Sequence, residues 1–149
     1  MLALNEIPLM NAREISNGIW VSGQPTSEQL ALIHAAGVRT LVNLCPAGEC
    51  GWDEQREAER SGLVYSSIPI INGDDLNREA ALQLHQTLAN CAKPVLVHCG
   101  SSNRAGALFA LRSFYVEGCD IEMALQQGRA AGLKELEPVV RQILSSMSK

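Results

Sequence analysis

The sequence has no uninterrupted apolar run that would cross a membrane. Its apolar stretches all fall short of the roughly 20 residues that a spanning helix needs. The N-terminal segment carries Glu6, Pro8 and Arg13 among its apolar residues, so it lacks the basic start and unbroken apolar core of a signal peptide. We therefore expect a soluble, cytoplasmic protein with no membrane partner.

The sequence also lacks an excess of positive charge. Lysine and arginine together number 12, against 16 aspartate and glutamate residues, which gives a formal net charge of −4. A chain of this charge has no general attraction to nucleic acids or anionic lipid surfaces. Nucleic acid is therefore not expected as a partner, although a local basic pocket remains open.

Cysteines are present, but their spacing does not suggest a metal site. Cys45 and Cys50 form a close pair, and no second close pair of Cys or His completes a set of four ligands. The five cysteines are an odd number in a chain of 149 residues, which is long enough to bury a core without crosslinks. We expect free thiols, no bound metal and no cofactor.

Low-complexity tracts, repeats and long linkers are missing as well, and we expect a single domain over residues 1–149. Apolar patterning predicts strands that alternate with helices. The predicted strands cover residues 17–23, 38–45, 63–70 and 93–99. The predicted helices cover residues 26–37, 52–62, 78–92, 104–118, 120–132 and 136–147. This order predicts an α/β fold with a central, mostly parallel sheet flanked by helices.

The stretch "PVLVHCGSSNRAG", residues 94–106, contains the strongest functional signal. Cys99 ends a predicted strand, at the edge where parallel sheets bind ligands, and Arg104 opens the next predicted helix. The loop between them consists of Gly100, Ser101, Ser102 and Asn103. Backbone N–H groups of such a loop can converge on one anion at a helix N-terminus. The arginine adds a bidentate donor, so the site would stabilise a thiolate at Cys99 and a bound oxyanion.

Other interpretations of this stretch remain open. A buried cysteine at a strand end followed by a glycine turn is common in proteins with no chemistry there. A dinucleotide-binding loop is less consistent, because Gly100 and Gly106 do not have its spacing.

The segment "HCGSSNRAG" resembles the phosphate-binding loop of tyrosine and dual-specificity phosphatases, whose signature is His-Cys, five residues and Arg. Further segments resemble, in order, the bacterial phosphatase-like family related to the N-terminal domain of beta-lactamase hydrolase-like proteins. The resemblance covers residues 16–133 and rests on the segments "SGQPTSEQLALIHAAGVRTLVNL", "IPI", "PVLVHC", "NRAGALFALR" and "GRAAGL". It implies a compact cysteine-phosphatase fold of the dual-specificity type.

The resemblance also implies roles for individual residues. Cys99 would be the nucleophile that forms a phosphocysteine, and Arg104 would clamp the phosphate. Residues 100–105 would form the phosphate loop, which includes Ala105 where tyrosine phosphatases often carry a hydroxyl that helps to release the thiolate. His98, directly before the nucleophile, would hydrogen-bond the loop. The proton for the leaving oxygen would come from the segment "INGDDLN", where Asp74 is preferred over Asp75 because Asp75 is closer to the next helix and suits a cap.

Two features depart from the tyrosine phosphatase pattern. Only four residues separate Cys99 from Arg104, a spacing usual in the bacterial family and shared with the active loop of rhodanese sulfurtransferases. Ser102 stands where the bacterial family usually has glycine, so a backbone angle that favours glycine is expected to be either strained or altered there.

We therefore expect a cysteine-dependent enzyme that hydrolyses a phosphate monoester, on a phosphorylated protein or a small molecule. A rhodanese-like sulfurtransferase and a non-catalytic phosphate-binding or phosphoprotein-binding module are the alternatives. The sequence indicates neither the physiological substrate nor the oligomeric state.

Overall fold

The protein is described by a computed structural model over residues 4–46 and 48–147. The strands are β1 (Arg13–Ser16), β2 (Ile19–Ser22), β3 (Thr40–Asn43), β4 (Val64–Ser67) and β5 (Val95–His98). The helices are α1 (Ser27–Ala35), α2 (Glu54–Arg60), α3 (Arg78–Asn90), α4 (Asn103–Tyr115), α5 (Ile121–Ala130) and α6 (Glu137–Met147), with short 3-10 turns at Leu4–Glu6 and Gly73–Asp75.

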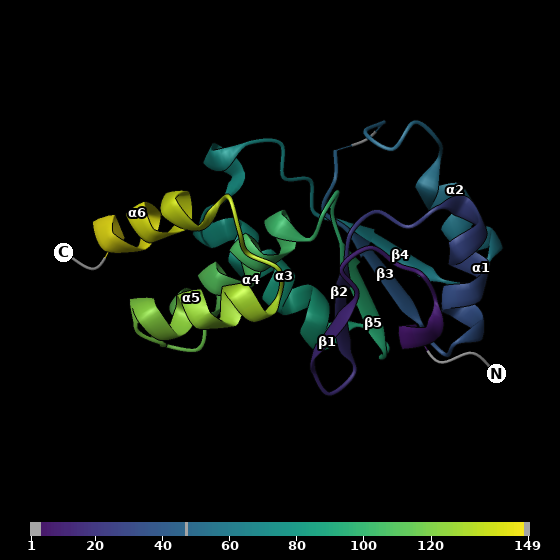
Figure 1. The fold of residues 1–149 in the computed structure, drawn as a ribbon, viewed down its shortest axis with the longest axis horizontal. Coiled ribbons are helices and arrows are strands. Elements are labelled where there is room, and N and C mark those ends of the chain that lie inside the picture. The colour runs from purple at the N-terminus through teal and green to yellow at the C-terminus, as the bar shows by residue number, and fades with distance from the viewer. Residues whose placement is uncertain (1–3, 47, 148–149) are drawn as a thin grey trace.

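These strands form one sheet in the order β1-β2-β5-β3-β4, with helices on both faces (Figure 1). Only β1 runs antiparallel to its neighbour, and the other pairs are parallel. The predicted α/β architecture with a mostly parallel sheet is confirmed. Among the described residues, no helix is long and apolar enough to span a bilayer.

The strand β1 is the element that sequence patterning did not predict. It lies at the sheet edge, its residues alternate between half-buried and exposed, and Ile15 is its one strongly apolar residue. A two-residue turn, Asn17-Gly18, joins it to β2, and Gly18 has φ of +82°. Asn-Gly is the preferred pair for such hairpins, so this dipeptide was the available signal.

The predicted limits of α1 are confirmed by its caps. Thr26 accepts the N–H of Gln29 at 3.2 Å, and the Gln29 side chain accepts the N–H of Thr26 at 2.9 Å. Gly37, just past the helix, has φ of +104°, a conformation that favours glycine. The connection from β2 to α1 lies beside the end of β5, where the Gln24 N–H donates to the Gly100 carbonyl.

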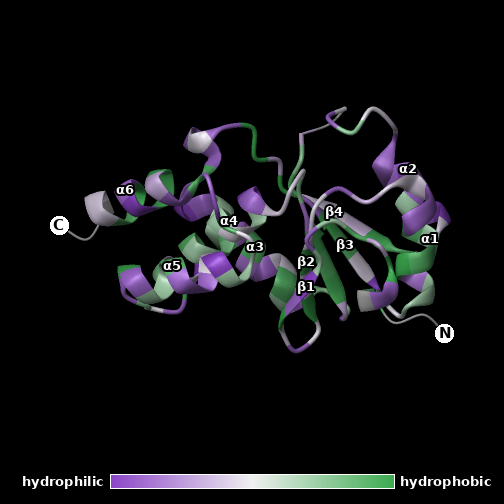
Figure 2. Cartoon of the chain, viewed as in Figure 1, coloured by the Kyte–Doolittle hydropathy of each residue, from purple (hydrophilic) through white to green (hydrophobic). Residues whose placement is uncertain are grey.

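The central strand β5 contributes to two cores because successive side chains point to opposite faces. Val95, Val97 and Cys99 belong to the core under α3 and α4, whereas Leu96 belongs to the core under α1 and α2. Figure 2 shows hydrophobic residues along the central strands. Cys99 and His98 are therefore expected on opposite faces of the sheet.

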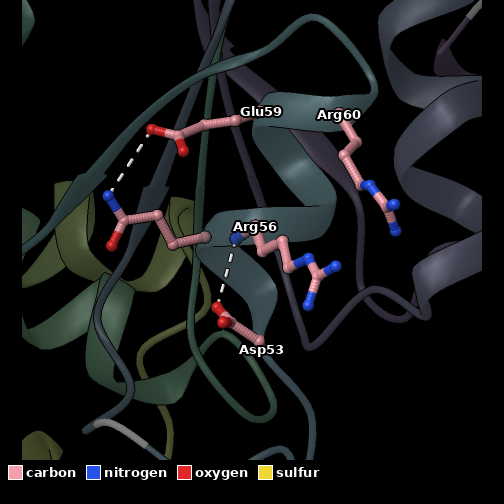
Figure 3. Close-up of a pocket in the computed structure, with 5 residues that line it drawn as sticks. Asp53, Arg56, Glu59 and Arg60 are labelled. Atoms are coloured by element: carbon pink, nitrogen blue, oxygen red, sulfur yellow. Dashed lines mark hydrogen bonds between the residues drawn. The ribbon is translucent and has the colours of Figure 1, made fainter.

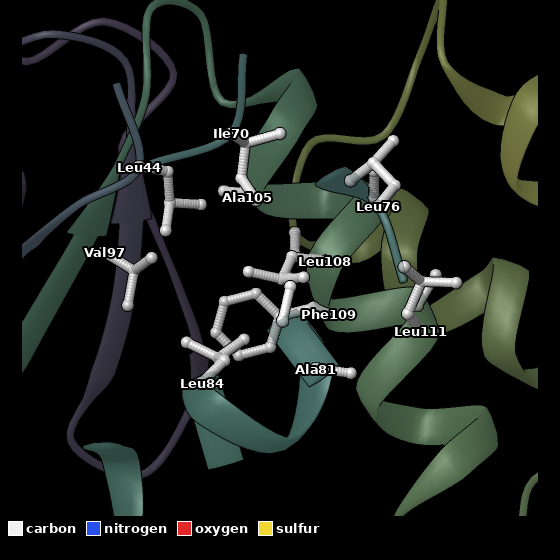
Figure 4. Packing of buried hydrophobic residues seen from close by; sticks show 14 of the residues in the cluster. Leu44, Ile70, Leu76, Ala81, Leu84, Val97, Ala105, Leu108, Phe109 and Leu111 are labelled. Atoms are coloured by element: carbon white, nitrogen blue, oxygen red, sulfur yellow. The ribbon is translucent and has the colours of Figure 1, made fainter. Parts of the chain in front are cut away.

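Packing on the Cys99 side fixes the start of α4 against the sheet. Val97 lies opposite Leu108 and Phe109 of α4 and Leu84 of α3 (Figure 4). Ala105, in the first turn of α4, is fully buried. The helix that follows the Cys99 loop is thus held rigidly behind it.

Candidate active site

Cys99 directly follows β5, which lies between β2 and β3 in the sheet. Its backbone N–H points to the carbonyl of Ser22 at 3.4 Å, and its side chain is fully buried. The chain then turns within three residues and enters α4 at Asn103. This is the strand-loop-helix arrangement that the sequence predicted.

The loop curls back toward the Cys99 sulfur. The backbone N–H of Ser102 donates to Cys99 Sγ at 3.1 Å. Ser102 reaches this position with φ of +80°, in the left-handed region that favours glycine. Its hydroxyl donates to the carbonyl of Ala131 at 2.9 Å, which ties the loop to the end of α5. Of the two outcomes expected at Ser102, a strained or an altered backbone angle, the structure shows the strained one.

Three other segments hold the loop from outside. The Asn11 side chain donates to the Ser101 carbonyl at 2.8 Å, and the Gln24 backbone N–H donates to the Gly100 carbonyl at 3.0 Å. On the far side, Oδ1 of Asn103 accepts a backbone N–H at 2.8 Å from the segment between α5 and α6. These bonds occupy loop carbonyls and the Asn103 side chain, so they fix the loop without using its N–H groups.

Arg104 lies over the loop, where it forms a bidentate ion pair with Glu49. Nη1 is 3.0 Å from Oε1 and Nη2 is 2.6 Å from Oε2. Nη1 also donates to the Ile70 carbonyl at 3.2 Å, and Nη2 is 3.6 Å from the Cys45 sulfur. The hydrogen bonds from Arg104 lower the pKa of Glu49 to about 2, and Glu49 in turn raises the pKa of Arg104 above its usual range.

Glu49 is a site residue that the sequence analysis missed. It lies in the "PAGE" segment after β3, whose carboxyl end is at the same sheet edge as Cys99. That shared edge was the available signal.

The Cys45 thiol lies beside Arg104 and is not ionised. Burial is the main cause that raises the pKa of this thiol well above its usual value, and a hydrogen bond with Glu49 raises it further. Cys45 therefore remains protonated.

His98 lies on the opposite face of the sheet from Cys99. Its Nε2 forms a short contact with Glu54, at the start of α2, and both side chains are buried. The other Glu54 oxygen accepts Nε2 of Gln24 at 2.7 Å. Nδ1 of His98 is 3.4 Å from the Cys99 carbonyl. His98 thus contacts the start of the loop at the Cys99 backbone carbonyl. Glu54, which is buried, is a second residue that sequence reasoning missed.

The two predicted acids differ in their surroundings. The Asp75 carboxylate accepts the N–H groups of Ile71 at 2.8 Å and Asn72 at 3.3 Å, as part of a capping box around the 3-10 turn. The expected capping of the next helix by Asp75 is wrong, because Asn77 is the N-cap of α3 and Asp75 instead closes the capping box of its own turn. Asp74 is exposed on the same turn, which lies beside α6 (Figure 1). The structure places neither carboxylate in contact with Arg104.

Two hollows lie on the α2 side of the molecule. One, with a volume of about 480 Å³, is lined by polar and charged side chains of α2 and its N-cap and contains none of the predicted site residues (Figure 3). The other has a volume of about 590 Å³ and includes Cys45, Trp52 and Tyr65. Because Cys45 also contacts Arg104, this second hollow adjoins the site. No cluster of three metal-ligating side chains occurs within residues 4–46 and 48–147.

Comparison with known proteins identifies relatives of this chain. A beta-lactamase hydrolase-like protein of Xylella fastidiosa is 35% identical over 107 residues, which cover 68% of this chain and 25% of the relative. The dual specificity protein phosphatase TpbA of Pseudomonas aeruginosa is 25% identical over 126 residues, covering 84% of this chain and 56% of TpbA. No family model matches the chain.

Solved structures of other proteins share the fold of this chain. A DUF442 protein of Shewanella putrefaciens superposes with a TM-score of 0.66 at 17% identity, over 94% of each chain. The chain thus has the fold of this DUF442 protein and is similar in sequence to the beta-lactamase hydrolase-like protein. Pseudomonas aeruginosa TpbA shares the fold of this chain, with a TM-score of 0.65 at 20% identity over 94% of this chain and 86% of TpbA. The chain spans a quarter of the length of its beta-lactamase hydrolase-like relative.

Proposed function

We propose that this chain is a cysteine-dependent phosphatase that hydrolyses phosphate monoesters through a phosphocysteine at Cys99. The observation that carries the proposal is the Ser102 N–H pointing at Cys99 Sγ, with the Arg104 guanidinium over the same loop. In the first step, the Cys99 thiolate attacks phosphorus, and the bond from phosphorus to the ester oxygen breaks. The leaving oxygen takes a proton from an acid. Water then attacks phosphorus and breaks the P–S bond, which releases phosphate and restores the thiolate.

The loop and Arg104 would supply most of the rate by positioning the phosphate and neutralising its charge. We assign the phosphate site to residues 100–105. We favour Asp74 as the acid, because the Asp75 carboxylate already accepts two backbone N–H groups. His98 would act as a support of the loop. The proposed reaction uses no metal and no cofactor.

The named relatives support a phosphorylated substrate. A TpbA variant has been crystallised with phosphotyrosine, and its structure superposes on this chain with a TM-score of 0.59. Further relatives include an inositol diphosphatase of Arabidopsis thaliana, 30% identical over 112 residues. We therefore propose a phosphorylated protein or a small phosphorylated molecule as the substrate class.

Hydrolysis of an aryl phosphate tests this proposal. We expect Cys99→Ser to lower kcat by roughly 10³-fold or more and Arg104→Ala to lower it by roughly 10²-fold or more, with the fold intact by circular dichroism. Cys91→Ser, a matched change outside the site, serves as the control and is expected to retain full activity. Turnover by Cys99→Ser equal to that of the natural chain would contradict the proposed nucleophile. Phosphate binding without turnover would indicate a binding module instead.

Sulfur transfer is a second candidate, favoured by the four-residue spacing between Cys99 and Arg104. In that reaction the thiolate attacks the outer sulfur of thiosulfate, the S–S bond breaks, and sulfite leaves a persulfide on Cys99. Mass spectrometry after incubation with thiosulfate is the test. A protein that gains no sulfur under these conditions is not a thiosulfate sulfurtransferase.

A further inference from the structure

The carboxylate of Glu49 occupies one pair of donors on Arg104, the fork formed by its two terminal nitrogens. Both terminal nitrogens of the guanidinium are engaged, each by a different Glu49 oxygen, at 3.0 and 2.6 Å. The pair is directly over the loop, because a side-chain carbon added to Gly100 would lie 3.0 Å from Arg104 Nη2 and 3.7 Å from Glu49 Oε2. The carboxylate therefore lies on the loop, at the arginine that we assign to phosphate.

A guanidinium fork binds carboxylates and phosphates in the same way, through two parallel N–H donors. One fork cannot give the same two donors to both groups. The carboxylate is a permanent anion, since Arg104 lowers the pKa of Glu49 to about 2. At neutral pH an arriving oxyanion therefore meets an arginine whose charge is already compensated.

We propose that Glu49 is an internal competitor for the anion site, which a substrate phosphate must displace from Arg104 before it can bind. The inference rests on the proposed function, since it concerns the same arginine and loop. Glu49 then sets how tightly an anion must bind in order to occupy the site. Ligands that bind weakly are excluded at low concentration, and a phosphate held by the loop N–H groups as well as Arg104 replaces the carboxylate.

The surroundings of Glu49 are consistent with displacement. Its side chain is 37% exposed, against 22% for Arg104, so the carboxylate lies on the solvent side of the pair. Neighbouring Gly48 and Gly51 have φ of +85° and +82°, and an added side-chain carbon at either would contact nothing within 4 Å. The carboxylate is thus attached to a turn with little packing around its glycines, and moving it breaks few other contacts.

Competition of this kind lowers the affinity of every oxyanion by the same factor, because each must displace the same carboxylate. The Arg104–Glu49 pair is partly exposed, which weakens it, but it is bidentate, which strengthens it. We therefore expect the competition to weaken anion binding by a factor of about ten. The effect should appear in binding and KM rather than as a loss of kcat.

Calorimetric titration with inorganic phosphate, and separately with sulfate, tests the proposal in four proteins: the natural chain, Glu49→Gln, Glu49→Asp and Glu57→Gln. Glu49→Gln should tighten both anions by about tenfold. Glu49→Asp keeps the charge but shortens the side chain by one methylene, so it should resemble Glu49→Gln. The control Glu57→Gln removes an exposed carboxylate that pairs with Arg60 on α2, and it should match the natural chain.

The outcomes separate this inference from the proposed function. Unchanged or weaker binding in Glu49→Gln, with binding lost in Arg104→Ala, would overturn the competitor role and leave the anion site in place. Equal tightening in Glu57→Gln, or natural affinity in Glu49→Asp, would indicate a long-range charge effect and also overturn it. If none of the proteins binds phosphate or hydrolyses an aryl phosphate, the proposed function fails, and the inference fails with it.

Discussion

Ser102 shows how one side chain can be retained at an unfavourable backbone angle. A left-handed conformation costs an L-residue roughly 1–2 kcal/mol relative to glycine. The buried hydroxyl of Ser102 offsets part of this cost by its 2.9 Å bond to the Ala131 carbonyl. The loop amide that faces Cys99 is therefore held by a balance between backbone strain and a side-chain hydrogen bond.

Two substitutions separate these contributions. Ser102→Ala keeps the strained angle and loses the hydroxyl, so we expect it to lower the free energy of unfolding by about 1 kcal/mol. Ser102→Gly loses the same hydroxyl but relieves the strain, so it should be more stable than Ser102→Ala by about 1 kcal/mol. Urea denaturation of both variants measures the difference. Equal stability would mean that the angle at residue 102 is not strained.

Of the contacts between site residues, some can be predicted from the sequence and others cannot. Cys99 and Arg104 are close in the chain, so a strand-loop-helix pattern is enough to predict that they meet. Glu49 and Glu54 both follow β3 in the chain, and their contacts with Arg104 and His98 depend on how the turn after β3 folds. No local pattern specifies that turn, so these carboxylates were not predicted.

The element that must be placed most accurately is α4, since its first turn carries Arg104. Two glycines, Gly106 on α4 and Gly128 on α5, allow these helices to approach closely. A side-chain carbon at Gly106 would lie 2.1 Å from the backbone nitrogen of Leu133 and 2.7 Å from the Gly128 carbonyl oxygen. Backbone atoms cannot move aside as a flexible side chain would, so α4 and α5 fit together only without a side chain there.

Gly106→Ala should therefore destabilise the protein by about 3 kcal/mol, although alanine is favoured over glycine in a helix by about 1 kcal/mol. Gly118→Ala is a suitable comparison, because its φ is +74° and nothing lies near the added carbon. It should cost only about 1 kcal/mol, from backbone strain alone. Thermal and urea denaturation provide the measurement. A Gly106→Ala variant as stable as the natural chain would show that α4 and α5 can separate at little cost.

Periodicity predicts the long, buried elements well and the edge poorly. β5 is nearly all apolar because both of its faces are covered, and the capped helix α1 was recognisable from Thr26 and Gly37. The edge strand β1 buries half of its side chains only partly, so its apolar pattern is weak. Strand ends also differ by one to three residues from those predicted, because hydrogen bonding rather than hydropathy ends a strand.

For the whole molecule, the site brings anion-binding groups together in a chain of net charge −4. The Ser102 N–H, the N-terminus of α4 and Arg104 lie at one sheet edge, and Glu49 compensates the charge of Arg104 there. The chain matches only part of the length of its beta-lactamase hydrolase-like relatives. A single domain over residues 1–149 stays a prediction.

The central claim is that Cys99 becomes covalently phosphorylated during turnover. Ala105, beside the loop, lacks the hydroxyl that would help the thiolate to leave, which favours accumulation of the intermediate. The direct measurement is to quench the protein in acid during hydrolysis of an aryl phosphate and to determine the mass of the peptide that contains Cys99. We predict an added mass of one phosphoryl group on Cys99. Continued hydrolysis with no phosphoryl group on that cysteine, or with the group on another residue, would contradict the account.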